Sequence, residues 1–379
     1  MNSIYLDYAA TTPLAERVLE AMLPYLREVH ANPSSLHAPG RLARRGVEKA
    51  REQVAAAIGA KAKEIIFTSG ATEADNMALR AVAAQHPGKH ILTSSVEHAA
   101  VLATARALET QGHPVTYLAP DKRGAITPDA VAEALRDDTA LVALMAVNNE
   151  TGVKTDVAAV GEIVGERGVP FFCDAVQAFG FQPLDVKALN VDMLSLSAHK
   201  VYGSKGAGVL YMREGLELPP LLYGGEQERG LRAGTHNVPA IVGMGKAAEL
   251  AVERLPEVEE LAGRRNNFEA KLLRLDSVSS NGARAPRGPK HCNVQVRGVD
   301  GEALLMNLDA LGVYASAGSA CAAGSLEPSH VLTAMGLTDE AAKASVRFSL
   351  GYEVTDSQLE EAAERFVEAV SRCRAFAEV

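Results

Sequence analysis

The chain contains few cysteines. Four occur among its 379 residues, and no two of them stand in a C-x-x-C pair: they are Cys173, Cys292, Cys321 and Cys373. This scatter argues against a disulfide framework and against a zinc ribbon. We therefore expect four thiols in a reducing compartment and no resident metal site.

Long apolar runs and basic tracts are also missing. No segment approaches the run of about 18 apolar residues that a membrane helix needs. The first residues lack a basic region followed by an apolar one, which argues against a secretory signal. The net charge is −9, and no basic run is interleaved with aromatic residues. We therefore expect a cytoplasmic protein that binds neither membranes nor nucleic acid.

The rest of the composition is typical of a globular protein with a sizeable core. Hydrophobic residues make up 47% and charged residues 22%, and the length fits one large and one smaller domain. Short apolar or β-branched runs alternate with helical patterns at residues 64–67, 90–93, 115–118, 140–147, 170–173, 193–196 and 208–212. This alternation predicts an α/β fold with a mainly parallel, seven-stranded sheet covered by helices.

The pattern changes after residue 250. A charged helical pattern covers about 250–275, and an amphipathic one covers 357–374. We expect a large α/β domain over residues 14–250, and a smaller α+β domain formed by residues 1–13 and 251–379. Because ligands of open α/β sheets bind beyond the carboxyl ends of the strands, residues that follow the strands are candidates for a functional site.

One strand runs into small residues that begin a helix. Thr68-Ser-Gly-Ala-Thr-Glu73 follows the first run, and the helix after it has an apolar stripe made of Ala74, Met77, Ala78, Ala81 and Val82. Backbone N–H groups at a helix N-terminus, here near Ala71 and Thr72, bind anions, and a phosphate is the natural ligand. An ordinary capped helix explains the same residues, so this segment alone leaves both readings open.

Two other strands end in groups that carry chemistry. Asp174 follows the run 170–173, where a carboxylate can pair with a protonated ring nitrogen, although helix-capping Asp residues are common. Lys200 follows the run 193–196, and an amine at the end of a core strand can be desolvated, as Schiff-base chemistry requires. The glycines after Lys200 do not follow G-x-G-x-x-G, which argues against a nicotinamide cofactor.

A single thiol stands in a run of very small residues. Residues 315–325 contain only Ala, Gly, Ser and Cys321. The run cannot fill a core and its glycines relax the backbone, so it predicts a mobile loop that presents a thiol. A small buried side chain is the alternative interpretation of Cys321.

Taken in order, these motifs resemble one family along nearly the whole chain. The sequence is similar to the class V branch of the fold-type I pyridoxal-phosphate enzymes, and specifically to the cysteine desulfurases of the NifS/IscS type. The motifs that carry the resemblance lie at residues 5–13, 32–35, 68–73, 96–98, 147–152, 174–177, 193–208, 228–235, 321 and 346–351. Each motif is common by itself, but their combination is specific.

The resemblance implies a pyridoxal 5'-phosphate site. Lys200 would form the Schiff base with the cofactor, and Asp174 would bind its pyridinium nitrogen. Gln177 would bind the ring hydroxyl, and His98 would stack on the ring and move protons. The phosphate would be held by Ala71, Thr72, Ser197 and His199, together with Thr235 from the second subunit of a homodimer.

The resemblance also implies a reaction. Asn149, which would also contact the cofactor, and Arg347 would hold the carboxylate of L-cysteine, and Lys200 would remove its Cα proton. The Cys321 thiolate would then attack the substrate sulfur, with His98 as the base that activates it. The products would be L-alanine and a persulfide on Cys321.

The persulfide sulfur would pass to an acceptor protein, for iron–sulfur cluster assembly or for tRNA thiolation. The sequence leaves open which acceptor is used and whether Cys321 transiently binds an iron–sulfur cluster. An aminotransferase or a selenocysteine lyase would keep Lys200 and Asp174, but an aminotransferase would not need Cys321. A non-catalytic sulfur- or metal-binding protein has little support, because the cysteines lack metal-ligand spacing.

Overall fold

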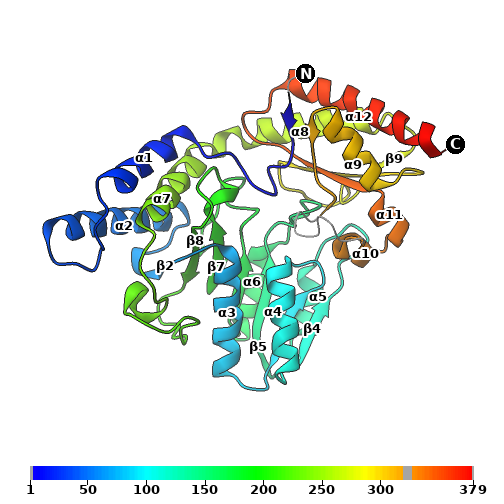
Figure 1. The fold of residues 1–379 in the computed structure, drawn as a ribbon. Helices are drawn as coiled ribbons and strands as arrows, with labels where there is room; N and C mark the ends of the chain where they lie inside the picture. The colour runs from blue at the N-terminus through cyan, green and yellow to red at the C-terminus, as the bar shows by residue number, and fades with distance from the viewer. Residues whose placement is uncertain (1–2, 319–326, 378–379) are drawn as a thin grey trace.

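The computed structural model describes residues 3–318 and 327–377. Its centre is a seven-stranded sheet with the order β2-β8-β7-β6-β5-β3-β4 (Figure 1). Only β8 runs against its neighbours, so the sheet is mainly parallel, as expected. Each of the seven expected runs falls on one strand: β2 (Ile65–Thr68), β3 (His90–Ser94), β4 (Val115–Leu118), β5 (Thr139–Met145), β6 (Phe171–Asp174), β7 (Met193–Ser197) and β8 (Gly208–Met212).

Helices cover both faces of the sheet. Alternate strand residues point to opposite faces, so Phe172 and Met193 pack under α3 while Phe171 and Leu194 join the core on the other face. The expected apolar stripe of α3 is buried, which confirms that prediction. The helices of this part are α1 (Glu16–Arg27), α2 (Ala38–Ala57), α3 (Ala71–Gln85), α4 (Ala99–Thr110), α5 (Pro128–Ala134), α6 (Val157–Glu166) and α7 (Val238–Glu253).

The C-terminal part combines a small antiparallel sheet with helices. The sheet has the order β12-β10-β9 and consists of β9 (Val278–Ser280), β10 (His291–Val296) and β12 (Ser345–Ser349). Its helices are α8 (Val258–Leu272), α9 (Gly301–Ala310), α10 (His330–Ala334), α11 (Asp339–Lys343) and α12 (Asp356–Ala377). The N-terminal β1 (Ile4–Tyr5) pairs in parallel with β11 (Val313–Tyr314), so both ends of the chain lie on this part (Figure 1).

The charged pattern over residues 250–275 is not one helix, which corrects the expectation. α7 ends at Glu253, a 3₁₀ turn covers Leu255–Glu257, and α8 begins at Val258. Pro256 has no backbone N–H to continue the α7 hydrogen bonds, so the chain turns there. In contrast, α12 confirms the expected C-terminal helix. Among the described residues, no helix has both the length and the apolar character needed to cross a membrane.

Candidate active site

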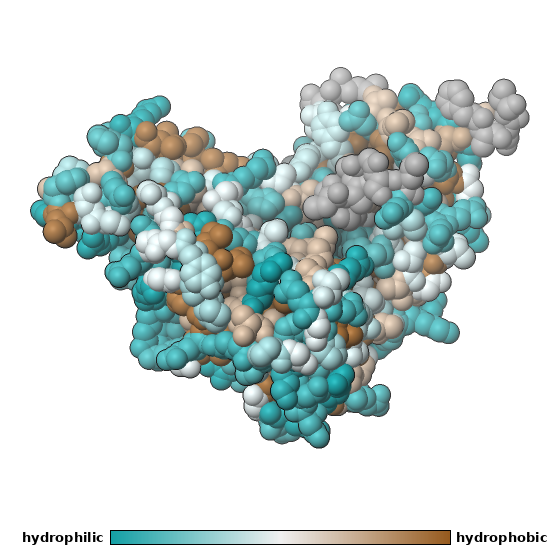
Figure 2. Space-filling view, turned by 60° about the horizontal axis from the view of Figure 1, so that its bottom comes forward, coloured by the Kyte–Doolittle hydropathy of each residue, from teal (hydrophilic) through white to brown (hydrophobic). Residues whose placement is uncertain are grey.

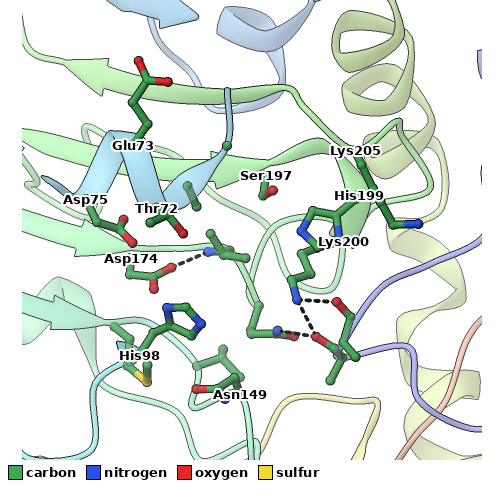
Figure 3. A pocket seen from close by; sticks show the side chains of 18 of the residues that line it. Thr72, Glu73, Asp75, His98, Asn149, Asp174, Ser197, His199, Lys200 and Lys205 are labelled. Carbon is green, nitrogen blue, oxygen red and sulfur yellow. Dashed lines mark hydrogen bonds between the residues drawn. The ribbon is translucent and has the colours of Figure 1, made fainter. Parts of the chain in front are cut away.

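A cavity of about 430 Å³ lies beyond the carboxyl ends of the central strands (Figure 3). Ten side chains expected from the sequence line it: Ala71, Thr72, His98, Asn149, Asp174, Gln177, Ser197, His199, Lys200 and Arg347. They come from segments spread over more than half of the chain. The sheet therefore brings the separate sequence motifs to one place.

The N-terminus of α3 forms one wall of this cavity. Gly70 is the N-cap residue, and it has no side chain that could cap the first backbone N–H groups of the helix. A Cβ atom on Gly208 of the neighbouring strand would lie 2.5 Å from the Gly70 carbonyl carbon, so this turn needs glycine at position 208. The N–H groups near Ala71 and Thr72 thus remain as donors for an anion, at the positive end of the helix dipole.

Asp174 ends β6 at the floor of the cavity. The carboxyl is buried, and its Oδ1 accepts a hydrogen bond of 3.0 Å from the Val176 backbone N–H. Burial raises the pKa of Asp174, while the charges of His98 and Lys200 oppose this rise. The protein's own charged groups therefore offset the burial of Asp174 only in part, and a cationic ligand in the cavity would stabilise its ionised form.

Lys200 closes the 3₁₀ turn Ala198–Lys200, which follows β7 directly. Its Nζ donates to the carbonyl oxygens of Ala9 and Ala10, at 2.8 and 2.6 Å. Gln177 Nε2 donates to the same Ala9 oxygen at 3.0 Å, and Gln177 Oε1 is buried without a hydrogen-bond partner among the described residues. The N-terminal segment thus orients two groups that the family resemblance assigns to the cofactor.

Burial disfavours the charged form of both cavity histidines. His98 caps α4, and its Nδ1 accepts from the Ala100 backbone N–H at 3.2 Å, so the neutral ring carries its proton on Nε2. Burial lowers the pKa of His98. Burial, helped by the charges of nearby lysines, lowers the pKa of His199 to about 4, and its Nδ1 lies 3.1 Å from Thr11 Oγ1.

Arg347 lies on β12, where the C-terminal sheet meets the cavity. Its Nη2 donates to Asp7 Oδ1 at 2.7 Å, and its Nη1 donates to the Asn149 carbonyl oxygen at 3.0 Å. The residue is 1% exposed, yet Nε has no hydrogen-bond partner within the described part of the chain. This buried donor at the cavity wall suits a ligand carboxylate.

Cys321, the expected nucleophile, lies outside the described residues. On either side of this gap, Gly318 and Ser329 both adjoin Glu150. Ser329 Oγ donates to Glu150 Oε2, and a Cβ atom on Gly318 would lie 2.5 Å from that oxygen. Burial raises the pKa of Glu150.

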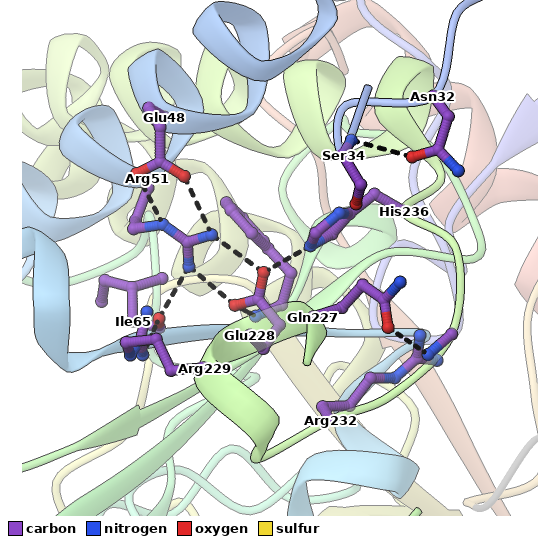
Figure 4. A network of polar contacts seen from close by, with 12 residues as sticks. Asn32, Ser34, Glu48, Arg51, Ile65, Gln227, Glu228, Arg229, Arg232 and His236 are labelled. Carbon is purple, nitrogen blue, oxygen red and sulfur yellow. Dashed lines mark hydrogen bonds and ion pairs between the residues drawn. The ribbon is translucent and has the colours of Figure 1, made fainter. Parts of the chain in front are cut away.

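Thr235 is exposed and does not line the cavity of its own chain, and its expected role across subunits stays a prediction. Its segment is anchored by Glu228, as Figure 4 shows. Glu228 accepts from Arg51 at 2.7 and 2.8 Å, from the Phe67 backbone N–H at 2.9 Å, and pairs with His236 at 2.7 Å. Here the backbone turns through left-handed conformations at Glu228 (φ 47°), Arg229 (φ 60°) and Gly230 (φ 79°).

Asp75 and Glu97 are buried acidic groups to which the sequence motifs assign no role. Asp75 lines the cavity and is 1% exposed, and Glu97 is buried beside the strand that leads to His98. A signal for Asp75 was available, because positions 75, 79 and 82 share one face of a helix whose other members are apolar. Glu97 carries no comparable pattern.

Comparison with known proteins places the chain in a family. The family model for aminotransferase class-V matches residues 4–361. A cysteine desulfurase IscS from Methanosarcina thermophila is 47% identical over 376 residues, which cover 98% of this chain and 93% of the relative.

Two solved structures are also similar. A NifS-like protein superposes with a TM-score of 0.92 and 36% identity, over 98% of this chain and all of the other. SspA, described in complex with cysteine, has a TM-score of 0.82 and 41% identity, over 91% of this chain and 98% of the other. The chain therefore belongs to the aminotransferase class-V family, within its cysteine desulfurases of the NifS and IscS type.

Proposed function

We propose that this protein is a pyridoxal-phosphate-dependent cysteine desulfurase that converts L-cysteine to L-alanine and transfers the sulfur to Cys321. The observation that carries this proposal is the shared cavity. It combines the N-terminus of α3, the buried Asp174 carboxyl, the Lys200 amine and Arg347 Nε, a donor that has no hydrogen-bond partner among the described residues. A phosphorylated cationic ring and an amino-acid carboxylate match these groups in charge.

The residues present fit the cofactor. The backbone N–H groups at the start of α3 suit the phosphate, and Asp174 suits a protonated ring nitrogen. The buried Gln177 Oε1, which has no partner among the described residues, suits the ring hydroxyl. When bound, the cofactor supplies an electron sink for the negative charge that develops at the substrate Cα.

Lys200 holds the cofactor and moves the Cα proton. Its Nζ is already oriented toward the cavity by the carbonyl oxygens of Ala9 and Ala10. Once released from the cofactor, this amine accepts the substrate Cα proton at Nζ. During this proton transfer, Arg347 Nε and the Asn149 side chain hold the substrate carboxylate.

His98 is the proposed base for the Cys321 thiol. Because Nδ1 accepts from the Ala100 N–H, the neutral ring carries its proton on Nε2 and donates a hydrogen bond from there. The lone pair of the neutral ring is therefore on Nδ1. When the ring takes up the thiol proton there, it gives up the hydrogen bond to Ala100 and becomes an imidazolium.

Cys321 is the proposed sulfur carrier. Its thiolate attacks the substrate sulfur, so a new S–S bond forms while the substrate Cβ–S bond breaks. The electron pair of the broken bond stays with the carbon, which takes up protons and leaves as L-alanine. The persulfide sulfur then passes to a thiol of an acceptor protein, such as an iron–sulfur scaffold or a relay for tRNA thiolation.

A second copy of the chain is the proposed partner at the phosphate, through Thr235. Exposed apolar side chains gather on α1, α2 and the turns around them, at the left of Figure 2, and they are Leu14, Leu26, Leu36 and Leu42. Exposed apolar patches favour protein partners. A homodimer in the cytoplasm is therefore part of the proposal.

Incubation with L-cysteine tests the function. We expect L-alanine to accumulate and a peptide that contains Cys321 to gain the mass of one sulfur atom. A protein that holds pyridoxal phosphate but releases no alanine from L-cysteine would contradict the proposal.

A further inference from the structure

Asp75 places a carboxyl group on the buried face of α3, where an apolar side chain is the usual occupant. It lies in the second turn of α3, on the face that packs on the central sheet, and it is 1% exposed. Its Oδ1 has no hydrogen-bond partner within the described part of the chain. The same residue lines the cavity of the proposed active site.

The fold aims Asp75 and Asp174 at each other. Asp174 on β6 is paired in register with Ser195 on β7. Phe172 and Met193, two positions earlier on these strands, pack under α3, so Asp174 and Ser195 point to the α3 face as well. Figure 3 shows the two carboxyl groups side by side at the floor of the cavity.

Two buried carboxyls that lie side by side do not both ionise readily, because each charge disfavours the other. Burial raises the pKa of Asp75, and the charge of Asp174 and, more weakly, that of Glu97 raise it further, against the opposing effect of Ser195. Asp174 differs, because His98 and Lys200 face it and favour its ionised form. The single proton of the pair therefore belongs on Asp75.

We propose that Asp75 is a positioning residue that stays a neutral acid beside Asp174, so that Asp174 is the one ionised carboxyl that meets the cofactor ring nitrogen. This inference rests on the proposed function. An ionised Asp75 would place a second negative charge beside Asp174 and drive a proton onto it. The ring would then lose its counter-ion.

Variants with and without the acidic proton test the role of Asp75. Asp75→Asn keeps the shape of the neutral acid but cannot ionise, and Asp174→Asn removes the proposed counter-ion. Equilibrium dialysis with pyridoxal phosphate at neutral pH should show near wild-type affinity for Asp75→Asn. For Asp174→Asn we expect a loss of about 10- to 100-fold, the range for a hydrogen bond to a charged group.

Infrared spectroscopy of the cofactor-free protein gives an independent readout. The carbonyl band of a protonated carboxylic acid should be present in the wild type at neutral pH and lose one component in Asp75→Asn. Glu97→Gln serves as a matched control, and it should remove a different component.

The outcomes separate this inference from the proposed function. The inference is overturned if Asp75→Asn removes no acid band, or if it weakens cofactor binding as much as Asp174→Asn does. If neither variant changes the affinity for pyridoxal phosphate, the proposed function itself loses its support.

Discussion

Arg347 on β12 and Asp7 near the N-terminus form a partly buried ion pair, with 2.7 Å between Nη2 and Oδ1. The two residues are separated by 340 positions. Asp7 also accepts from Ser316 Oγ at 2.8 Å, so one carboxylate ties the N-terminal segment to β12 and to the residues that follow β11. The arginine that we assign to the substrate is thus oriented by the chain before a substrate arrives.

Arg347→Lys should raise the KM for L-cysteine by about 10- to 100-fold, because lysine keeps the charge but lacks the Nε–H donor and the planar group that Asp7 and Asn149 orient. The kcat should change less, since the carboxylate is held in both ground and transition states. Steady-state kinetics of alanine formation measure both constants. Arg372→Lys on the exposed face of α12 is the matched control and should leave KM unchanged. An unchanged KM in Arg347→Lys would assign the carboxylate to another group.

Cys321→Ala should retain bound pyridoxal phosphate, measured by its visible absorbance, but release no sulfide in the presence of L-cysteine and a reducing thiol. The reason is that the variant lacks the nucleophile for the substrate sulfur. Cys373→Ala, which changes a buried cysteine on α12, is the control and should still release sulfide. Undiminished sulfide release from Cys321→Ala would remove this residue from the mechanism.

Glu97→Gln should stabilise the protein at neutral pH. Burial raises the pKa of Glu97 from 4.5 to about 8, so the folded state holds a proton that the unfolded state releases between these values. The wild type therefore loses stability as pH rises from about 4.5 to 8, and the variant lacks this loss. At pH 7 we expect a gain of about 3 kcal/mol in the free energy of unfolding, and at pH 4 almost none.

Urea unfolding of wild type and Glu97→Gln at the two pH values measures this difference. An equal gain at pH 4 and pH 7 would show that packing, and not protonation of Glu97, is responsible.

Glu228→Gln should destabilise the protein by about 3 to 5 kcal/mol at neutral pH, because it leaves the buried Arg51 guanidinium without its counter-ion. The hydrogen bonds and charge of Arg51, helped by His236 and the Phe67 N–H, outweigh the effect of burial and lower the pKa of Glu228 to about 2. Its contribution is thus complete above about pH 4.5 and is lost as pH falls toward 2. The variant should lack this acid-dependent loss.

Thermal unfolding between pH 2 and 7 tests the role of Glu228. Glu214→Gln is the control. Like Glu228, Glu214 forms two ion pairs, here with two lysines, but it lies at the surface, where solvent screens the pairs. Equal effects of the two substitutions would mean that burial of the Glu228 network adds nothing.

The central sheet and most of the cavity could be predicted from local patterns. Asp174 and Lys200 each follow a short apolar run, and the carboxyl ends of parallel strands meet at one edge, so their meeting required no long-range information. Arg51 and Glu228 are different. They are 177 positions apart, and no periodicity links an arginine on a helix to a carboxylate in an irregular turn.

Asp75 illustrates a second limit. Acidic side chains are almost never fully buried unless they are paired, so its residue type suggests the surface. The helical spacing with positions 79 and 82 places it on the apolar face, but only the packing of α3 on β6 and β7 brings it beside Asp174. Tertiary contacts therefore decide the ionisation of this group, and local sequence patterns do not contain them.

The left-handed turn at Glu228, Arg229 and Gly230 has a consequence for assembly. Non-glycine residues adopt such conformations only at an energetic cost, and here the ion pair with Arg51 holds them in place within one chain. The segment that leads to Thr235 therefore becomes ordered when the chain folds. The conformational entropy of this segment is lost during folding and not during association. Association of two chains would begin from a preorganised surface, so less ordering would oppose it.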